Sequence, residues 1–429
     1  MPIQPIDNKE PMPLLGEEQW LFTPPIPRDL EGLGISPGLV TDLVLRRLAV
    51  EGTTTLVSLG QVLKLPGGVI HGVFNNLRQQ QLIEVKGMVG NDYRISLSAS
   101  GRALASERMQ ASQYSGPAPV SLKAYTDAVK LQSTEVEINR ETLRAAYSDL
   151  ILTDGLLDQL GPALIEQASI FLYGPPGNGK SSLAERLLRV YEDAVLIPYC
   201  VEVDNQVISL YDPAVHLKVG DEDEDRDPRW VLCRRPCIIV GGELTASLLE
   251  LRHDSTSGTY SAPLQMKANN GIFVIDDFGR QLMSPRELLN RWIVPLDRRV
   301  DYLSLKYGLK FEVPFRLLVV FATNLNPSEL ADEAFLRRIH NKIYVGAVLP
   351  EAFDEIFRRV ARARSVAVTP ESFVMLRQLC LGDGRSELRS CYPNDVCTIL
   401  NSIARYEGRE PSATAEDLQR AVRLYFAAD

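Results

Sequence analysis

The chain has 429 residues, of which 45% are hydrophobic and 24% charged, and its net charge is −9. That length allows two or three domains with real cores, and the composition is that of an ordinary soluble protein. The acidic balance argues against binding of nucleic acid over the whole surface, while leaving room for one basic module.

Neither a membrane span nor an exported protein is predicted. No apolar run is long enough to cross a bilayer, and residues 1–15 have neither the basic start nor the apolar stretch of a secretory signal. The six cysteines are scattered, with no C-x-x-C pair and no histidine at ligand spacing, so zinc is not expected. Scattered cysteines without an export signal predict a cytoplasmic protein.

Residues 1–35 are rich in proline and show little periodicity, which predicts an extended or disordered arm. Within it, Trp20–Phe22 could form a small docking patch or could pack against the chain's own body.

Residues 36–112 form a module with a different pattern. Ser36 and Pro37 open a helix, and two more helices are expected over 55–63 and 68–80. Strands are expected over 82–86 and 93–97, with a last helix from Ser98. Three helices and a β-hairpin resemble a winged helix, whose DNA-binding members place the third helix in the major groove.

The third helix has one apolar face and one polar face. The apolar face holds Val69, Ile70, Val73, Phe74 and Leu77, and the free face offers Asn75, Asn76, Arg78, Gln79 and Gln80. The module carries eight basic and five acidic residues, a modest balance. Polar helix faces are usually just solvated and winged helices also bind proteins, so DNA and protein partners both stay open.

Residues 113–138, with Gly116–Pro119, are predicted to link this module to the next domain. A helix is expected over 139–147, and segment 150–164 is expected to pack near an adenine base.

The strongest motif is a phosphate-binding loop that fits G-x-x-x-x-G-K-[S/T]. An apolar strand over 170–173 precedes it and a helical pattern over 183–191 follows it. The glycines let backbone N–H groups approach phosphates, Lys180 would reach the β- and γ-phosphates, and Ser181 would hold Mg²⁺. The predicted nucleotide-binding residues are Gly174, Pro175, Pro176, Gly177, Asn178, Gly179, Lys180, Ser181 and Ser182.

A second motif is an apolar strand, residues 271–275, that ends in two carboxylates. Asp276 would hold Mg²⁺ through its water shell and Asp277 would polarise the attacking water. Acidic pairs after strands also occur as plain turn formers, but the preceding phosphate loop favours the functional interpretation.

Two later segments complete the pattern. The strand over 316–323 ends at Asn324, whose amide could orient the lytic water. Arg337 and Arg338 follow a predicted helix and precede a strand over 342–345. They could serve only the helix dipole, or they could reach a neighbouring subunit's site.

These four elements, in this order, resemble the AAA+ ATPases over roughly residues 140–429. The resemblance implies ATP and Mg²⁺ as cofactors, a ring-shaped homo-oligomer with six subunits expected, and Arg338 as the finger arginine with Arg337 in reserve. Four helices after Pro350, over 351–364, 372–381, 395–406 and 415–426, resemble the family's helical lid. At the family's sensor-2 arginine this chain has Asn394. Either Arg389 substitutes for it, or the coupling between nucleotide and lid is weakened.

Two further segments bear on the subtype. Residues 300–314 predict a hairpin that turns near Gly308, and a hairpin before the sensor strand resembles the MoxR-like and enhancer-binding branches. Residues 243–267 are expected to be an insertion or a pore loop. The acidic run 221–227 is expected to be a solvated loop, since it lacks the glycine turn of a calcium site.

The predicted fold class is therefore α/β: an AAA+ parallel sheet (139–348) with a helical lid (349–429), preceded by a small winged-helix domain. The predicted function is Mg²⁺-dependent ATP hydrolysis that remodels a macromolecular client selected by the winged helix, with a protein client favoured over DNA. The alternatives are an ATP-regulated DNA-binding regulator and a nucleotide switch that barely hydrolyses.

Overall fold

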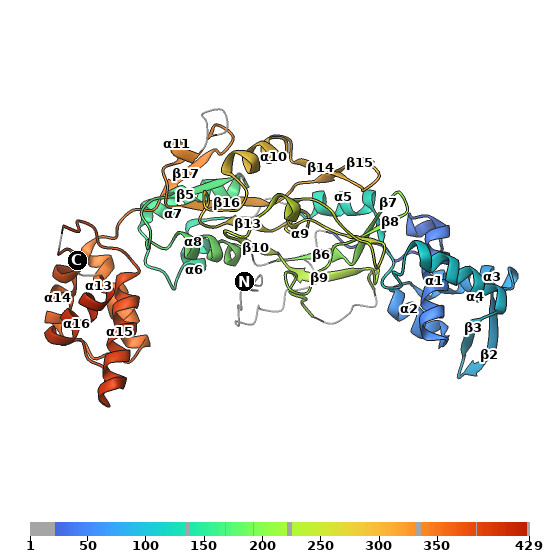
Figure 1. The fold of residues 1–429 in the computed structure, drawn as a ribbon, viewed down its shortest axis with the longest axis horizontal. Helices are drawn as coiled ribbons and strands as arrows, with labels where there is room; N and C mark the ends of the chain where they lie inside the picture. Colours follow the sequence, from blue (N-terminus) through green and yellow to red (C-terminus); the bar gives the residue numbers. More distant parts are fainter. Residues whose placement is uncertain are drawn as a thin grey trace. The chain divides into compact units, whose positions relative to one another are not determined.

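The computed structural model describes residues 22–133, 138–167, 169–191, 193–220, 225–330, 336–382 and 384–426 (Figure 1). The chain divides into two units. Unit 1 comprises Met1–Glu135, Tyr191–Phe273 and Asn290–Leu318, and unit 2 comprises Val136–Val190, Val274–Leu289 and Val319–Asp429.

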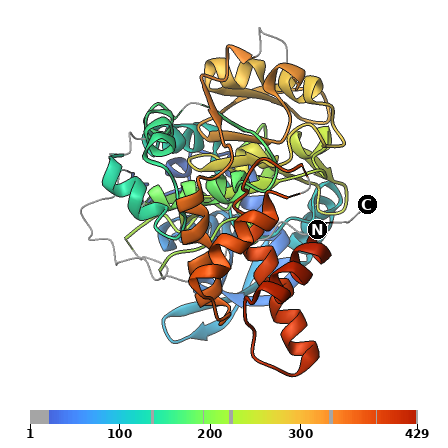
Figure 2. The ribbon, with the colours of Figure 1, turned by 90° about the vertical axis from the view of Figure 1, so that its left-hand side faces the viewer.

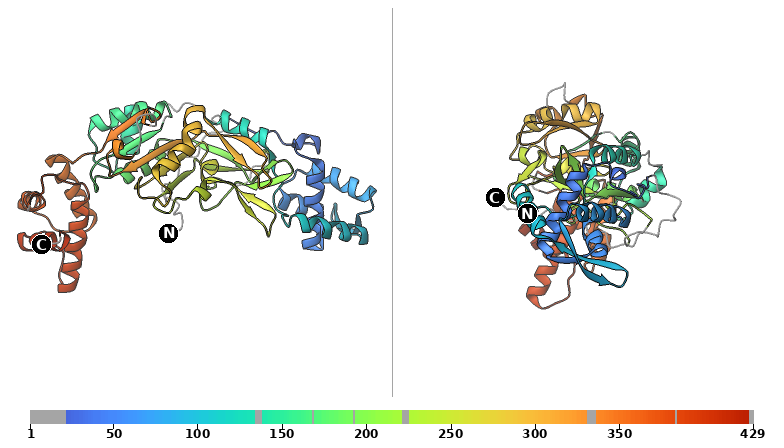
Figure 3. Two further views of the ribbon diagram at one scale, coloured as in Figure 1. Left: turned by 45° about the horizontal axis from the view of Figure 1, so that its top comes forward. Right: turned by 90° about the vertical axis from the view of Figure 1, so that its right-hand side faces the viewer.

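Unit 1 begins with a helical module that carries a small sheet (Figures 1 and 3). The sheet has the order β1-β3-β2 and is antiparallel. The predicted helices and hairpin are confirmed, with Thr55 and Ser98 side chains capping α2 and α4. The elements, after the short turn η2 (Glu31–Leu33), are α1 (Pro37–Glu51), β1 (Thr53–Thr55), α2 (Leu56–Leu63), α3 (Gly67–Gln79), β2 (Ile83–Val89), β3 (Asp92–Leu97) and α4 (Ala99–Ala111).

Helix α3 has the two faces that its sequence predicts. The five apolar residues named above are all buried in the module's core, because they recur at helical spacing. The polar residues of the opposite face, Asn75, Asn76, Arg78, Gln79 and Gln80, are exposed.

The rest of unit 1 is rich in β-structure built from strands far apart in the chain. One sheet has the order β11-β12-β8-β7-β4, and β6 pairs with β9 as a separate ribbon. The strands are β4 (Val120–Ser121), β6 (Ala194–Pro198), β7 (Cys200–Val203), β8 (Gln206–Ser209), β9 (Trp230–Arg234), β11 (Arg252–Asp254) and β12 (Thr259–Ser261). Segment 243–267 thus supplies β11 and β12, together with η4 (Ala246–Leu249) and α9 (Leu264–Lys267).

The stretch predicted to be a linker holds regular structure. It contains β4, which pairs with β7, and helix α5 (Leu122–Leu131). Tyr125, Ala128 and Val129 of α5 are buried in a hydrophobic cluster, so this segment belongs to the core of unit 1. The domain limits given above remain predictions.

Asp227, expected in a solvated acidic loop, is 2% exposed and pairs with Arg229 at 2.7 Å. Residues 221–224 of that run lie outside the described residues. Arg229 also donates to the carbonyl oxygens of Leu33 (3.2 Å) and Pro119 (3.0 Å), so the pair connects three separate segments.

The predicted hairpin over 300–314 is confirmed as β14 (Val300–Ser304) and β15 (Lys310–Pro314), with Gly308 at φ 92° in its turn. It follows α10 (Pro285–Arg298).

The five-stranded sheet has the order β10-β13-β16-β5-β17, and β5 runs parallel to both of its neighbours. Its strands are β5 (Ile170–Tyr173), β10 (Cys237–Val240), β13 (Ile272–Ile275), β16 (Leu318–Thr323) and β17 (Asn341–Tyr344). Most of their apolar residues are buried, as expected of strands covered on both faces, whereas Tyr344 of the edge strand β17 is exposed. Helices α6 (Arg140–Ala146), α7 (Asp154–Ile165), α8 (Lys180–Arg186), η3 (Leu187–Val190) and α11 (Pro327–Leu330) complete this part. The fold class is α/β, as predicted.

The C-terminal region is helical, as predicted (Figure 2). Its four helices share a core centred on Phe353, Phe357, Val396 and Leu418. They are α13 (Pro350–Ala363), α14 (Pro370–Cys380), α15 (Tyr392–Glu407) and α16 (Ala415–Tyr425).

Among the described residues, no single helix has the length and apolar composition needed to cross a membrane. Helices α2 and α3 reach that composition only when taken together across a 117° bend.

Candidate functional site

The phosphate-binding loop follows β5 and depends on glycines with left-handed backbone. Gly174, Gly177 and Gly179 have φ values of 138°, 80° and 83°. A Cβ atom on Gly174 would lie 2.4 Å from the carbonyl oxygen of Val345, so no larger residue fits there. The glycines therefore give the loop both its turn and its close approach to the strand beside it.

Lys180, the first residue of α8, is 7% exposed. Its ammonium donates to the carbonyl oxygens of Gly174 and Pro175, both at 2.9 Å. Burial lowers the pKa of Lys180, and the carboxylates of Asp276 and Asp277 oppose that shift. The loop thus encloses a cation at the place where the motif predicts one.

Ser181 and Asp276 lie together although 95 residues separate them. The Ser181 hydroxyl donates to Oδ2 of Asp276 at 2.7 Å. Asp276 follows the last residue of β13, and both side chains are partly buried. A hydroxyl and a carboxylate in contact form an oxygen donor set of the kind that Mg²⁺ prefers, so these residues fit the predicted metal.

Asp277 lies beside Asn324. The Asn324 amide donates to Oδ1 of Asp277 at 3.2 Å. Asp277 is exposed, its φ is 48°, and its N–H donates to Oδ1 of Asp276 at 3.0 Å. The unusual backbone turns one carboxylate toward Ser181 and the other toward Asn324.

Two residues that the sequence analysis did not identify hold this turn. Gln281 donates to the carbonyl oxygens of Asp276 (2.9 Å) and Asp277 (3.1 Å). Thr323, 1% exposed, donates to the carbonyl oxygen of Phe278 at 2.7 Å and so fixes the end of β16 to the turn after β13. In the sequence, Gln281 follows Asp277 closely and Thr323 directly precedes Asn324, and this proximity to the predicted site residues could have indicated both.

The backbone of Arg338 lies at the start of β5, the other end of that strand from this cluster. The carbonyl oxygen of Arg338 accepts from the Ser169 hydroxyl at 3.3 Å, at the start of β5, whereas the phosphate loop follows its end. At about 3.3 Å per residue, the four residues of β5 separate these ends by roughly 13 Å. Residues 331–335, predicted to precede the arginines as a helix, lie outside the described residues.

Of the two sensor-2 candidates, Arg389 lies at the loop. Its Cδ would be 3.7 Å from a Cβ placed on Gly177, and its buried Nε has no hydrogen-bond partner among the described residues. The Asn394 side chain instead accepts from Arg364 at 2.8 Å. Segment 150–164 becomes α7, and its role near an adenine base remains a prediction.

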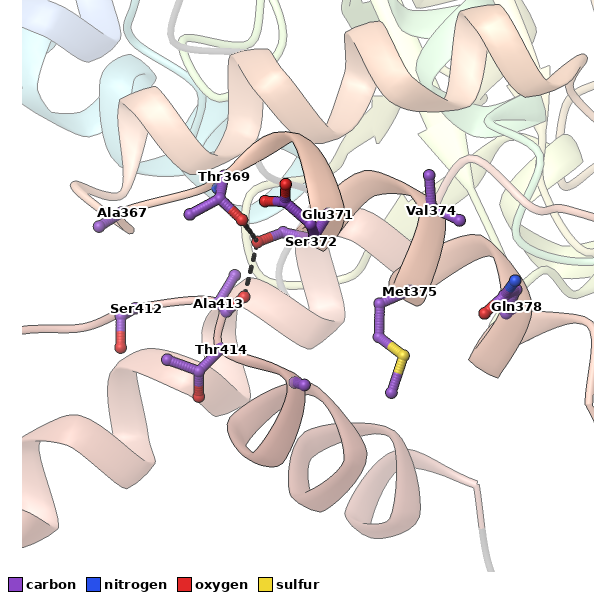
Figure 4. Close-up of a pocket in the computed structure, with 11 residues that line it drawn as sticks. Ala367, Thr369, Glu371, Ser372, Val374, Met375, Gln378, Ser412, Ala413 and Thr414 are labelled. Atoms are coloured by element: carbon purple, nitrogen blue, oxygen red, sulfur yellow. Dashed lines mark hydrogen bonds between the residues drawn. The ribbon is translucent and has the colours of Figure 1, made fainter.

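A separate cavity of about 450 Å³ lies in the C-terminal region between α14 and residues 412–415 (Figure 4). Met375 and Val374 line it, and the Ser372 hydroxyl at its wall already donates to the carbonyl oxygen of Ala413 at 2.7 Å. None of the predicted site residues lines it.

A family model described as a domain of unknown function, DUF8689, matches residues 349–424, which hold α13 to α15 and most of α16. A search of curated proteins found no match for the chain.

Among solved structures, a mutant of Thermotoga maritima RuvB is 12% identical, covers 65% of this chain and 72% of its own, and has a TM-score of 0.39. The FIGL-1 AAA domain in complex with ADP is 16% identical, covers 69% and 85%, and has a TM-score of 0.37. Because these scores lie below 0.5, the function proposed below depends on the site residues of this chain.

Proposed function

We propose that this chain is a Mg²⁺-dependent ATPase of the AAA+ type that works as a ring-shaped homo-oligomer, a hexamer, and remodels a macromolecular client. The observation that carries the proposal is the meeting of three separate segments at one edge of the sheet. Ser181 contacts Asp276 at 2.7 Å, and Asn324 contacts Asp277 at 3.2 Å. Carboxyl ends of parallel strands are where such sheets bind ligands.

The roles follow from the chemistry of these groups. Backbone N–H groups of residues 177–182 and the Lys180 ammonium bind the triphosphate of ATP. Ser181 and Asp276 hold Mg²⁺, which neutralises phosphate charge when bound. Asp277 accepts a proton from the attacking water, and Asn324 orients that water and the carboxylate.

The finger arginine, Arg338 with Arg337 in reserve, acts in the site of a neighbouring subunit. Support comes from its place at the amino end of β17, away from the loop of its own chain. A ring would supply each site with this further cation from its neighbour.

The module of residues 36–112 is a winged helix that selects the target, and we favour a protein target over DNA. At least five of its eight basic side chains already have partners within unit 1. These include Arg46 (Ser112 carbonyl), Arg47 (Glu51), Lys86 (Glu84), Arg102 (Leu97 carbonyl) and Arg108 (Asp42). Strong retention on DNA with a steep salt dependence would favour the DNA-binding regulator instead.

The experiment that tests nucleotide binding is calorimetry with ATP and Mg²⁺ on Lys180→Ala. Loss of the buried cation should remove most of the affinity, whereas Lys123→Ala, an exposed lysine on α5, should bind as the wild type does. Equal affinity in all three proteins would contradict the proposal. Tight binding with negligible turnover would favour the nucleotide switch.

A further inference from the structure

A short segment before α15, residues 389–391, contacts the phosphate loop directly. The N–H of Cys391 and the hydroxyl of Ser390 both donate to the carbonyl oxygen of Gly177, each at 3.0 Å. One carbonyl in the middle of the loop therefore accepts two hydrogen bonds from the C-terminal region, more than 200 residues away in the chain.

The packing at this contact is as close as the backbone allows. A Cβ atom on Gly177 would lie 2.5 Å from Sγ of Cys391, so only glycine permits the approach. On its other side, Sγ of Cys391 lies 3.7 Å from the hydroxyl of Tyr425. The next residue, Tyr392, is 4% exposed in the core of the helical region. Segment 389–391 is thus fixed to that core and does not hang freely over the loop.

The contact determines the direction of one amide of the loop. The peptide bond between Gly177 and Asn178 is trans, so its C=O and N–H point in opposite directions. Two donors hold the C=O toward segment 389–391, and the N–H of Asn178 must then point away from it. The Asn178 side chain does not fix the direction of this amide, because neither of its buried polar atoms has a hydrogen-bond partner among the described residues.

We propose that the Ser390 hydroxyl and the backbone N–H of residue 391 are positioning groups that preset the Asn178 amide for phosphate, so that the C-terminal region contributes to nucleotide affinity through Gly177. This inference rests on the proposed function, in which the loop binds the phosphates of a nucleotide. The ligand that reports on it is ADP, whose β-phosphate the loop would bind and which lacks a γ-phosphate.

The first test removes one donor. Ser390→Ala should weaken ADP binding in calorimetry by about fivefold, the value of one neutral hydrogen bond. The control is Ser402→Ala in α15, where an exposed hydroxyl donates to the Thr398 carbonyl at 3.0 Å. It should bind ADP normally. The thermal midpoint of Ser390→Ala should match that of the control, since a merely structural role would lower it.

The second test uses the contact between Gly177 and Cys391. Gly177→Ala should weaken ADP binding strongly, because the new methyl group meets Sγ. Cys391→Ala alone keeps the N–H donor and should bind nearly as the wild type does. In the double variant the methyl group has room, so part of the affinity should return and the two changes should not be additive.

The outcomes separate the two proposals. If the wild type does not bind ADP, the proposed function fails. If the wild type binds ADP and Lys180→Ala does not, while Ser390→Ala binds normally and the double variant is no better than Gly177→Ala, the positioning role is refuted.

Discussion

At the scale of single residues, the two carboxylates after β13 face different partners. Asp276 accepts from Ser181, and Asp277 accepts from Asn324. Their positions suggest a division of labour in which one binds metal and the other acts on water. That division can be tested one residue at a time.

Asp276→Asn should weaken the dependence of ATP binding on Mg²⁺, because an amide is a poorer ligand than a carboxylate. The measurement is the ratio of ATP dissociation constants with and without Mg²⁺. Asp158→Asn, an exposed carboxylate paired with Arg140, is the control and should leave the ratio unchanged. If Asp277→Asn shifts the ratio by the same amount as Asp276→Asn, the division is wrong.

His216 predicts a pH dependence of stability in unit 1. It is 1% exposed, its Nδ1 accepts from the N–H of Asp212, and its Nε2 lies 2.9 Å from the Lys267 carbonyl oxygen, to which it donates as a neutral ring. Burial lowers the pKa of His216 from 6.5 to about 4. Between these values the unfolded chain binds a proton that the folded chain does not, so stability falls as the pH decreases.

From pH 7 to pH 5 this group should cost roughly 2 kcal/mol of unfolding free energy. Urea unfolding of wild type and His216→Gln at both pH values measures it. The wild type should lose more stability than the variant on acidification. Equal losses would show that His216 does not contribute.

At the scale of elements, the sequence predicted those whose pattern is local. The helices of the C-terminal region, the hairpin over 300–314 and the strands that lead to Gly174, Asp276 and Asn324 were all expected, because periodicity and fixed motifs identify them. The β-rich part of unit 1 was not. Its strands are two to five residues long and pair across distance, as β4 does with β7.

The same reason explains what was missed at the site. The contact between Gly177 and segment 389–391 joins residues more than 200 positions apart. The sequence around Ser390 does not indicate which group its hydroxyl binds. Helix α5 was assigned to a linker because a proline-rich stretch precedes it. The burial of Tyr125 depends on strands that the sequence analysis did not expect.

Within unit 1, the stability of the fold should depend strongly on the buried ion pair Asp227–Arg229. Arg229→Ala leaves the Asp227 carboxylate buried without its cation, and the carbonyls of Leu33 and Pro119 lose a donor. The expected loss of unfolding free energy is about 3–5 kcal/mol. Replacing both members by Leu and Met should cost clearly less, and an equal cost would contradict this account.

At the scale of the whole molecule, the proposal requires more than one copy of the chain. The site of one copy contains a cation, a carboxylate pair and an amide, but its Arg338 lies at the opposite end of β5. Charge that grows on the γ-phosphate oxygens would therefore be neutralised from a neighbour.

Arg338→Ala should bind ATP normally and hydrolyse it more slowly by ~10³-fold. Mixing it with Lys180→Ala should restore some hydrolysis, because certain interfaces then join an intact loop to an intact finger. Full activity of a monomer, or no restoration in a verified mixed oligomer, would refute action in trans.

The most direct test of the central claim is the release of phosphate from ATP with Mg²⁺ by the wild type and by Asp277→Asn, with ATP affinity measured on the same samples. The account predicts turnover by the wild type, and in Asp277→Asn a fall of about 10²–10⁴-fold with affinity retained. That variant should also hold ATP and client together in a pull-down. Turnover that survives the substitution, or a wild type that binds ATP without releasing phosphate, would contradict the claim that this edge of the sheet is an ATPase site.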